Sequence, residues 1–423
     1  MKKVLIITYY WPPAGGPGVQ RWLKFVTYLR DFDIEPILYV PENPNYPIVD
    51  HALIKAMPEG IKIYKQPIFE PYGLARFLSS KKTKRISSGI IQTKNQSFLE
   101  KLLLWVRGNL FIPDARKYWV KPSVAYLAKV IENEKIGTII TTGPPHSVHL
   151  IGLKLKQRLA ISWISDFRDP WTSIGYHKKL KLTNTSKRKH KKLEALVLNS
   201  ADKIIVTSET TKKEFQAITQ QPITVITNGY DSDYKGTAVL DPQFTISHIG
   251  SLLTGRNPQN LWKVLAMLIQ ENKDFKEAIR LNLIGVVSDD VLKTINAYGL
   301  EPYVVLKPYV SHDEALELQR KSQVLLLAEI NAPETKGIIP GKLFEYMAAK
   351  RPILAIGPDD WDVASIIKAT HSGTTFNYSG EEDLKKLVVH WFQAFQNKQL
   401  TVQSKNIEMY SRHSLTKKLA TEL

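Results

Sequence analysis

The stretch GIIPGKLFEYMAAKRPILAIG, residues 337–357, combines features of a loop, a helix and a strand. An apolar run at 324–327, short enough for a buried strand, precedes it. Glycine and proline interrupt regular structure at 337–341, apolar residues then recur at helical spacing, and 353–356 is a second apolar run. A strand, a loop, a helix and a strand in this order predict a βαβ unit of a parallel sheet, and therefore an α/β protein.

The loop of this unit would lie at the carboxyl edge of the sheet, where backbone N–H groups and a helix N-terminus favour an anionic ligand. Gly341 ends the loop, and Lys342 and Glu345, three residues apart, fall on one face of the first helical turn. A cation for phosphate beside a carboxylate for sugar hydroxyls would suit a nucleotide diphosphate. A solvated Lys–Glu pair is the alternative, because such pairs are common on helices.

The start of the chain has a similar order of elements. An apolar strand is expected at 4–8, Gly15 and Gly16 lie in the loop that follows, and a helix with one apolar stripe begins near Val19. A glycine pair between a first strand and its helix lets the backbone approach a ligand closely. The spacing is not GxGxxG, so it does not indicate a dinucleotide-binding fingerprint.

Two further predicted strand ends carry polar side chains. His146 follows a strand and a Gly-Pro break, where a histidine is well placed for chemistry, although a lone histidine is more often structural. Asp166, Arg168 and Asp169 follow a strand at 163–165. Two carboxylates around an arginine usually form a local ion-pair network, and positioning of sugar hydroxyls is the other interpretation.

The second half of the chain restarts the pattern after a polar segment at 234–243, our candidate linker. A strand at 244–249 leads into Gly250 and Ser251, and Arg256 lies just before the next helix. Arginine at this position suits bidentate contact with phosphate, or it is simply exposed. The chain length is sufficient for two domains of ordinary size.

The formal net charge of +18 implies an anionic partner, which would be nucleic acid, an anionic membrane or a phosphorylated substrate. Two basic runs, 81–85 and 178–192, contribute to it, and such runs are most often solvated surface. Neither run contains the interleaved aromatic residues on which bases stack, so a membrane surface explains them at least as well. The amphipathic segment 98–112 is expected to pack on the core, with a membrane-facing surface as the minority alternative.

The chain contains no cysteine, which excludes disulfides and thiolate metal sites and fits a reducing compartment. No apolar run approaches the length needed to cross a bilayer. The start MKKVLIITYYW superficially resembles a signal peptide, but its apolar core is short and no small-residue cleavage site follows. We therefore expect a first buried strand and a cytoplasmic protein.

Taken together, these segments resemble glycosyltransferase family 4, whose members have the two-domain GT-B architecture. The resemblance extends over nearly the whole chain and depends on several motifs that occur in the family's order. These motifs are the Gly15-Gly16 loop, His146, SADKIIVTSETTKKEF at 200–215, Asn228-Gly229-Tyr230-Asp231, His248-Ile249-Gly250 with Arg256, and LFEYMAAKRPILA at 343–355.

The resemblance implies two Rossmann-like parallel-sheet domains that face a central cleft. They would be an acceptor-binding domain at 1–235 and a nucleotide-sugar-binding domain at 236–405, with a C-terminal helix at 406–423 that packs back on the first domain. It also implies a retaining, metal-independent hexosyltransferase that needs no cofactor. Such an enzyme moves a sugar from a UDP- or GDP-linked donor to a glycan or lipid-linked acceptor in bacterial surface-polysaccharide or lipopolysaccharide biosynthesis.

Site residues are carried over from the family's motifs. Donor binding is expected at Gly15, Gly16, Gly250, Ser251, Arg256, Gly341, Lys342 and Glu345, with Glu345 at the donor ribose. Catalytic positioning of the sugar or the acceptor is expected at His146, Asp166 and Arg168. No nucleophile is assigned, because front-face attack with retention of configuration needs none. The chain departs from the family at Gly337, where a first glutamate is usual, and at Ser251, where an arginine is usual.

Two other classes of function are kept as alternatives: a nucleotide-sugar epimerase of the same architecture, and a nucleic-acid-binding α/β protein, which only the charge favours. For the transferase, the expected partners are the nucleotide sugar, the acceptor and the anionic inner face of the cell membrane, to which the basic runs would attach the protein. No nucleic acid is expected.

Overall fold

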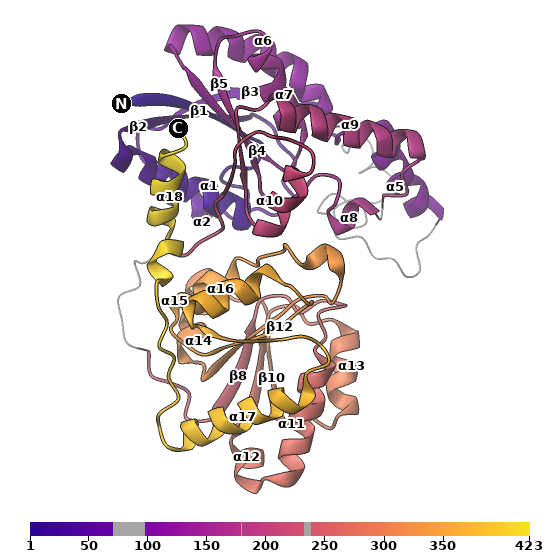
Figure 1. The fold of residues 1–423 in the computed structure, drawn as a ribbon, viewed down its shortest axis with the longest axis vertical. Helices are drawn as coiled ribbons and strands as arrows, with labels where there is room; N and C mark the ends of the chain where they lie inside the picture. Colours follow the sequence, from indigo (N-terminus) through magenta and orange to yellow (C-terminus); the bar gives the residue numbers. More distant parts are fainter. Residues whose placement is uncertain (71–97, 179, 232–237) are drawn as a thin grey trace. The chain divides into compact units, whose positions relative to one another are not determined.

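The computed structural model describes residues 1–70, 98–178, 180–231 and 238–423, which form two compact units (Figure 1). The N-terminal unit comprises Met1–Asn228 and Arg412–Leu423, and the C-terminal unit comprises Gly229–Ser411. The chain therefore changes unit between Asn228 and Gly229, within the motif Asn228-Gly229-Tyr230-Asp231. The basic run 81–85 and part of the predicted linker 234–243 lie outside the described residues.

In the described part of the N-terminal unit, a seven-stranded sheet has the order β3-β2-β1-β4-β5-β6-β7. Every paired strand is parallel to its neighbours, with Val4 opposite Pro36 and Thr138, for example. The strands are β1 (Lys2–Thr8), β2 (Ile34–Pro41), β3 (Lys62–Gln66), β4 (Thr138–Gly143), β5 (Ser162–Phe167), β6 (Lys203–Val206) and β7 (Ile223–Val225). The strands at the centre of this sheet are largely buried, as expected for a sheet covered on both faces.

Helices cover both faces of this first sheet. One core cluster joins the sheet to α6, α7, α9 and α10, and another joins it to α1 and α18. The helical segments of this unit are α1 (Pro17–Tyr28), η1 (Leu29–Phe32), α2 (Ala52–Lys55), α5 (Phe98–Leu110), α6 (Lys117–Glu134), α7 (Ser147–Lys156), α8 (Gly175–Lys178), α9 (Asn184–Ser200), α10 (Glu209–Gln216) and α18 (Arg412–Ala420). The last of these belongs to the far end of the chain and packs against α1.

The described part of the C-terminal unit has a six-stranded parallel sheet of order β10-β9-β8-β11-β12-β13. Its strands are β8 (Phe244–Ile249), β9 (Ile279–Ile284), β10 (Val304–Lys307), β11 (Val324–Ala328), β12 (Ile353–Ile356) and β13 (Gly373–Phe376). The predicted βαβ unit is confirmed, because β11 and β12 are adjacent and parallel and α15 connects them.

The second sheet is also covered on both faces. One cluster joins it to α11, α12, α13 and α17, and the other joins it to α14, α15 and α16. Its helical segments are α11 (Gln259–Glu271), α12 (Lys273–Ala278), α13 (Asp289–Ala297), η2 (Glu301–Tyr303), α14 (His312–Lys321), η3 (Pro333–Thr335), α15 (Lys342–Ala348), α16 (Asp362–Thr370), α17 (Glu381–Gln396) and η4 (Ile407–Tyr410). None of the helices in the described ranges of the chain combines the length and apolarity needed to cross a bilayer.

Candidate functional site

The carboxyl ends of β8 and β11 bring together the residues that the sequence assigns to donor binding. β8 ends at Ile249 and is followed by Gly250, whereas β11 ends at Ala328 and is followed by Glu329. Because parallel strands end at the same edge of a sheet, these residues share one edge with the first turn of α15.

Lys342 lies directly over the backbone of Gly250. A Cβ atom added to Gly250 would be 2.7 Å from Lys342 Nζ, closer than side chains can approach. Gly250 also has φ +117°, a left-handed conformation that glycine adopts without a steric penalty. The backbone conformation therefore requires glycine, and a Cβ atom here would displace the flexible end of the Lys342 side chain.

His248 also contacts the amine of Lys342. Its Nε2 atom lies 3.2 Å from Lys342 Nζ, and its Nδ1 atom lies 3.0 Å from the carbonyl oxygen of Leu326. A carbonyl only accepts, so Nδ1 carries the proton, and burial lowers the pKa of His248 well below its ordinary value. The imidazole is thus neutral, with Nε2 placed to accept a hydrogen bond from the lysine.

The positive charge of Lys342 is poorly solvated. Burial lowers the pKa of the Lys342 amine to about 8, and Arg256 lowers it further, whereas Glu329 and Glu345 raise it. An anion at this position would stabilise the charged amine, because opposite charge counteracts the loss of hydration. A partly buried cation at the carboxyl edge of a parallel sheet is therefore suited to bind phosphate.

Arg256 already forms an ion pair with a buried carboxylate. Its Nε and Nη2 donate to the two carboxylate oxygens of Glu329 at 2.9 and 3.1 Å, and the Glu329 side chain is fully buried. Its remaining terminal nitrogen, Nη1, has no hydrogen bond to any residue in the described ranges. Glu329 therefore orients the guanidinium of Arg256, and Nη1 remains available to a ligand.

The other predicted donor residues of the C-terminal unit surround this edge. Glu345 accepts a hydrogen bond from Gln319 Nε2 at 3.1 Å, and Ser251 is exposed in the loop after Gly250. Gly341 immediately precedes α15, and the loop before it is held by Trp361, whose indole donates to the carbonyl of Ile338 at 2.7 Å. These residues thus belong to one local constellation.

Gly15 and Gly16 belong to the N-terminal unit, in the loop between β1 and α1. The backbone N–H of Gly15 donates to Ile48 at 3.1 Å, and Gly16 has φ +112° immediately before α1. Arg168 lies against the first turn of α1. Its guanidinium occupies the space that a Cβ atom at Gly18 would need. Arg168 donates to the carbonyls of Gly143 and Pro144.

Asp166 is fully buried and joins α1 to the sheet. Its carboxylate accepts hydrogen bonds from Trp22 Nε1 at 2.9 Å and Thr142 Oγ1 at 2.6 Å. It also pairs with Arg21 at 3.3 Å, another buried side chain. An ion pair forms at this strand end, as one interpretation of the sequence expects, but its cation comes from α1 and is not Arg168.

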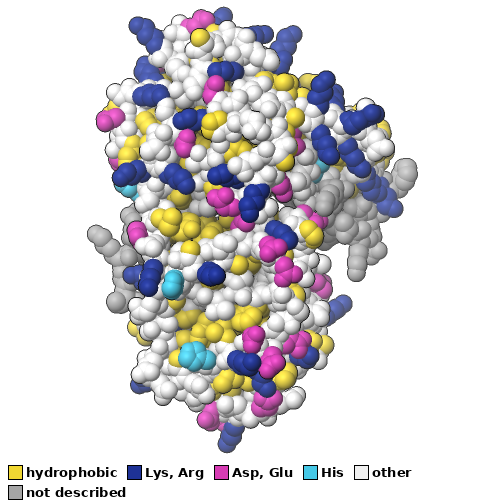
Figure 2. Space-filling view, in the orientation of Figure 1, with side chains coloured by type: hydrophobic (Ala, Val, Ile, Leu, Met, Phe, Trp, Pro, Cys, Tyr) yellow, Lys and Arg dark blue, Asp and Glu magenta, His cyan; other side chains and the backbone are white. Residues whose placement is uncertain are grey.

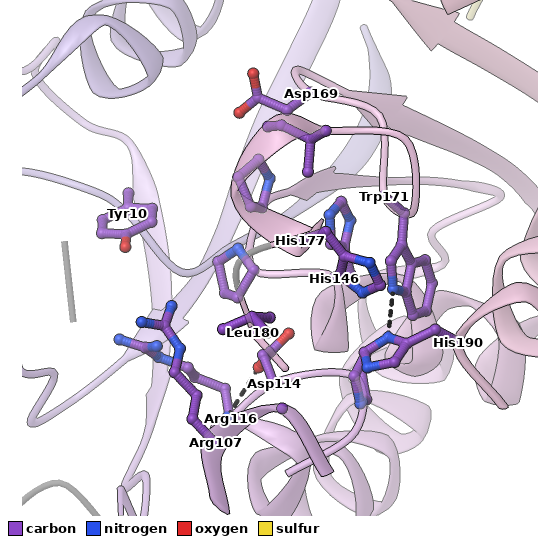
Figure 3. A pocket seen from close by; sticks show the side chains of 15 residues that line it. Tyr10, Arg107, Asp114, Arg116, His146, Asp169, Trp171, His177, Leu180 and His190 are labelled. Carbon is purple, nitrogen blue, oxygen red and sulfur yellow. Dashed lines mark hydrogen bonds between the residues drawn. The ribbon is translucent and has the colours of Figure 1, made fainter. Parts of the chain in front are cut away.

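His146 lines a cavity of about 300 Å³ in the N-terminal unit (Figure 3). Its ring stacks on the indole of Trp171, with centroids 4.8 Å apart, and the cavity reaches Tyr10 in the loop after β1. Figure 3 shows His146, Trp171, His177 and His190 together on one side, with Arg107 and Arg116 on the other. The complete lining is Tyr10, Arg107, Gly108, Pro113, Asp114, Arg116, Pro144, Pro145, His146, Asp169, Trp171, Ile174, His177, Leu180 and His190.

The sequence alone did not indicate roles for four residues of the two sites: Glu329, His248, His177 and His190. Glu329 follows an apolar strand directly, and its place after the predicted strand 324–327 was an available signal. In the sequence, His248 is only one member of the motif His248-Ile249-Gly250. His177 and His190 are surrounded by lysines, which suggest a solvated surface. In the parts of the chain that the structure describes, no group of three or more His, Asp or Glu side chains is placed to hold a metal ion.

The fold and the two strand-edge sites define a class of protein. Two parallel sheets, each covered by helices on both faces and each carrying polar side chains at the carboxyl edge, form the GT-B architecture of glycosyltransferases. Residues 91–234 match the model of the family described as Glycosyltransferase Family 4. The resemblance to this family is therefore confirmed.

Solved structures agree on the fold. A glycosyltransferase from Rickettsia africae has a TM-score of 0.62 at 13% identity, covering 100% of this chain and 99% of its own. Staphylococcus aureus TarM, in complex with fondaparinux, alpha-GlcNAc-glycerol and UDP, has a TM-score of 0.59 at 14% identity, with coverages of 100% and 99%. A putative UDP-N-acetylglucosamine 2-epimerase from Listeria monocytogenes has a TM-score of 0.54 at 12% identity, with coverages of 99% and 95%.

At these identities the similarity demonstrates the fold and not the substrate. No curated protein is similar enough in sequence to match the chain.

Proposed function

We propose that this protein is a retaining glycosyltransferase that moves a sugar from a nucleoside diphosphate sugar to a glycan or lipid-linked acceptor. The observation that carries the proposal is the partly buried amine of Lys342 over Gly250, at the carboxyl edge of the second sheet. A cation so placed favours a bound anion, and the diphosphate of a nucleotide sugar supplies one. The UDP in the TarM complex supports a donor of this class.

The donor residues have separate roles in this proposal. Lys342 and Arg256 contact the diphosphate, Gly250, Ser251 and Gly341 let the backbone approach it, and Glu345 accepts hydrogen bonds from the ribose hydroxyls. The donor base is uracil or guanine. In the N-terminal unit, Gly15 and Gly16 admit the sugar end of the donor, and His146 and Arg168 position the sugar or the acceptor. Asp166 acts through packing, because its contacts are with Arg21, Trp22 and Thr142.

The reaction breaks the bond between the anomeric carbon and the diphosphate oxygen, and it forms a bond from that carbon to an acceptor hydroxyl oxygen. The bonding electrons leave with the diphosphate, whose growing negative charge is stabilised by Lys342 and Arg256. The acceptor hydroxyl attacks from the face that the diphosphate leaves, and its proton passes to a diphosphate oxygen. This course needs neither a protein nucleophile nor a metal ion.

The proposal is tested by titrating the purified protein with UDP, GDP and ADP in a calorimeter, and by incubating it with UDP- and GDP-sugars and bacterial membrane extracts. We expect binding of UDP or GDP, and transfer with the anomeric configuration of the donor. If no nucleotide binds and no sugar is transferred, the proposal is wrong.

An epimerase of the same architecture is the second candidate, favoured by the similarity to the Listeria epimerase. It is distinguished by incubating a UDP-sugar with the protein in the absence of any acceptor. Conversion to the epimer under these conditions would replace the transferase proposal.

We also propose that the N-terminal unit attaches to the inner face of the cell membrane. The side chains of Leu102, Trp105 and Leu110 on α5 are 46%, 40% and 54% exposed, an unusual concentration of exposed apolar area on one short helix. Asn109 on α5 binds the backbone of Lys181 and Thr183, just before α9. The apolar surface is therefore joined to a strongly basic helix.

The basic helix supplies the second half of this surface. Lys187, Arg188, Lys189, Lys191 and Lys192 on α9 are all exposed. Figure 2 shows Lys and Arg side chains crowded at the edge of the unit where α9 lies. Apolar side chains beside lysines suit a surface of anionic lipid, at about 1 kcal/mol for each basic residue near the membrane.

Vesicle sedimentation tests the attachment. We expect the protein to sediment with vesicles that contain phosphatidylglycerol and not with neutral phosphatidylcholine vesicles, and the double variant Trp105→Ser, Leu110→Ser to bind less. Tyr309→Ser, which removes an exposed aromatic side chain from the C-terminal unit, is the matched control. Equal binding to both kinds of vesicle would contradict the proposal.

A further inference from the structure

We propose that the cavity beside His146 is a subsite for one uncharged sugar ring of the acceptor, whose hydroxyls bind to the imidazoles of His146 and His177. This inference rests on the proposed transferase function, but its ligand class is argued from the cavity alone. We call the four side chains on one side of the cavity, His146, Trp171, His177 and His190, the histidine wall (Figure 3).

The histidine wall presents buried nitrogen atoms that lack hydrogen bonds. Neither ring nitrogen of His146 has a partner among the described residues, and the same holds for Nε2 of His177. The side chains are 4% and 9% exposed. Buried polar groups in native proteins nearly always have a hydrogen-bond partner. Unpaired nitrogens that line a cavity therefore indicate that water or a polar ligand occupies it.

The histidines are uncharged. Burial lowers the pKa of His146 well below its ordinary value, and His149, His177 and His190 lower it further. Burial likewise lowers the pKa of His177 to about 4, with His190 contributing. Each ring is therefore neutral at physiological pH and offers one N–H donor and one lone pair.

Neutral imidazoles select the chemical class of the ligand. A hydroxyl both donates and accepts, so it satisfies either nitrogen of a neutral ring. A phosphate or carboxylate accepts only, and it would leave the lone pair of each imidazole without a partner. An array of neighbouring hydroxyls, which is what a sugar ring presents, therefore matches this wall better than an anion does.

The size of the cavity agrees with a single ring. Its volume of about 300 Å³ lies at the lower end of the range for small-molecule sites. A longer saccharide or a lipid chain would have to extend beyond it. We therefore assign the cavity to one residue of the acceptor glycan.

Contacts among its own side chains fix the orientation of the histidine wall. The indole of Trp171 donates to His190 Nδ1 at 3.1 Å, and His146 stacks on the same indole. His190 in turn meets His177 edge to face, with ring centroids 4.5 Å apart. Burial lowers the pKa of His190, and the nearby carbonyl of Gly108 opposes this effect. Trp171 thus positions His146 and His190, and Nε2 of His190, which also has no hydrogen-bond partner among the described residues, belongs to the same cavity lining.

Two of the charged groups around the cavity are engaged with the protein. Asp114 accepts hydrogen bonds from the backbone and hydroxyl of Ser147, and Arg116 pairs with Glu70 at 2.9 Å. Arg107 and Asp169 also line the cavity. The histidine wall therefore provides the unpaired polar atoms at which a ligand would bind.

The first test measures binding directly and does not depend on transferase activity. Imidazole nitrogen signals of the ¹⁵N-histidine-labelled protein are recorded with methyl glycosides of glucose, galactose, mannose and N-acetylglucosamine, and with pyrophosphate. We expect at least one glycoside to shift the signals of His146 and His177, assigned through His146→Gln and His177→Asn, and pyrophosphate to leave them unchanged. If no glycoside shifts them, or if only pyrophosphate does, the inference is wrong.

The second test uses transfer kinetics. His177→Phe keeps the ring volume but removes both nitrogens, and we expect the KM for the acceptor to rise at least tenfold while the affinity for UDP or GDP is unchanged. His177→Asn, which retains a donor and an acceptor, should recover part of the loss. His51→Phe and His51→Asn, at an exposed histidine of the same unit, are matched controls.

The two proposals fail in different ways. An unchanged acceptor KM in His177→Phe would overturn the subsite and leave the transferase intact. Glycoside shifts at His146 and His177 in a protein that binds no nucleotide would support the subsite and contradict the proposed function.

Discussion

Lys342 is the central residue of the proposed donor site, and its burial also destabilises the unliganded protein. Its folded pKa of about 8 is below the ordinary value of 10.5, because burial penalises the charged amine. Below pH 8 the amine is charged in both the folded and the unfolded chain, so this penalty is fully present. It is relieved as the pH rises from 8 to 10.5, where the folded chain alone loses the proton.

Replacement of Lys342 by Met should therefore have two opposite effects. We expect the affinity for UDP or GDP to fall by at least tenfold, because the cation is lost, and the unliganded protein at pH 7 to gain about 1–3 kcal/mol of stability. Calorimetry and thermal unfolding measure the two quantities. Lys336→Met, at an exposed pair with Asp360, is the control, and a Lys342→Met protein with undiminished nucleotide affinity would contradict the assignment.

The same pKa predicts how donor binding depends on pH. The empty site holds a charged amine below about pH 8 and loses it above that value. The Kd for UDP or GDP should therefore be flat from pH 6.5 to 7.5 and rise toward tenfold per pH unit above pH 8, with proton uptake on binding. In Lys342→Met this rise should be absent. A parallel rise in both proteins would place the titration on another group.

Gly250→Ala tests whether the glycine matters for the lysine above it. The added methyl would meet Lys342 Nζ and would also occupy a left-handed backbone conformation, so we expect a loss of about 1–3 kcal/mol and weaker nucleotide binding. Gly299→Ala shares the positive φ but has no atom within 4 Å of the added carbon. It should be destabilised without losing affinity, and equal affinity losses in both variants would contradict the contact.

At the scale of the elements, central strands could be predicted and most edge strands could not. β8 and β12 have the predicted bounds, 244–249 and 353–356, whereas β3, β10 and β13 were not predicted. Each of these three lies at the edge of its sheet and has at least partly exposed residues throughout. An edge strand is paired on one side only, so it lacks the continuous apolar run that identifies a buried parallel strand.

The sequence also predicts the start of a helix where a side chain caps it. Ser311 and Glu314 have the spacing of a capping box, and the Ser311 hydroxyl accepts a hydrogen bond from the backbone N–H of Glu314. The C-terminal segment was less readable. The residues from Asp383 to the end of the sequence have a helical pattern, but 397–406 is not helical and connects α17 to the short η4.

At the scale of the whole molecule, the end of the chain completes the unit in which it begins. α18 packs against α1 and contributes Leu415 and Leu419 to the core beneath it. Because the chain returns to the N-terminal unit after forming the C-terminal one, the stability of the first unit depends on residues some four hundred positions away.

Leu419→Ala tests this dependence. The side chain is fully buried, so we expect a loss of about 2–5 kcal/mol, with faster hydrogen exchange in β1 and α1 and unchanged nucleotide affinity. Leu400→Ala, in the core of the C-terminal unit, should instead accelerate exchange in β8 and α11. Equal effects of Leu419→Ala on both units would show that α18 does not act on the first unit alone.

The sequence by itself determined the α/β class, the central strands and the motif around Lys342, because each of these depends on residues close together in the chain. Only the tertiary structure decided that Arg256 pairs with Glu329, that Asp166 pairs with Arg21 in place of Arg168, and that His146 and His177 share a cavity. Local spacing specifies which way a side chain points from its element. Which distant side chain it meets is set by the order of strands in the sheet and the helices packed on it, and no short stretch of sequence encodes that order.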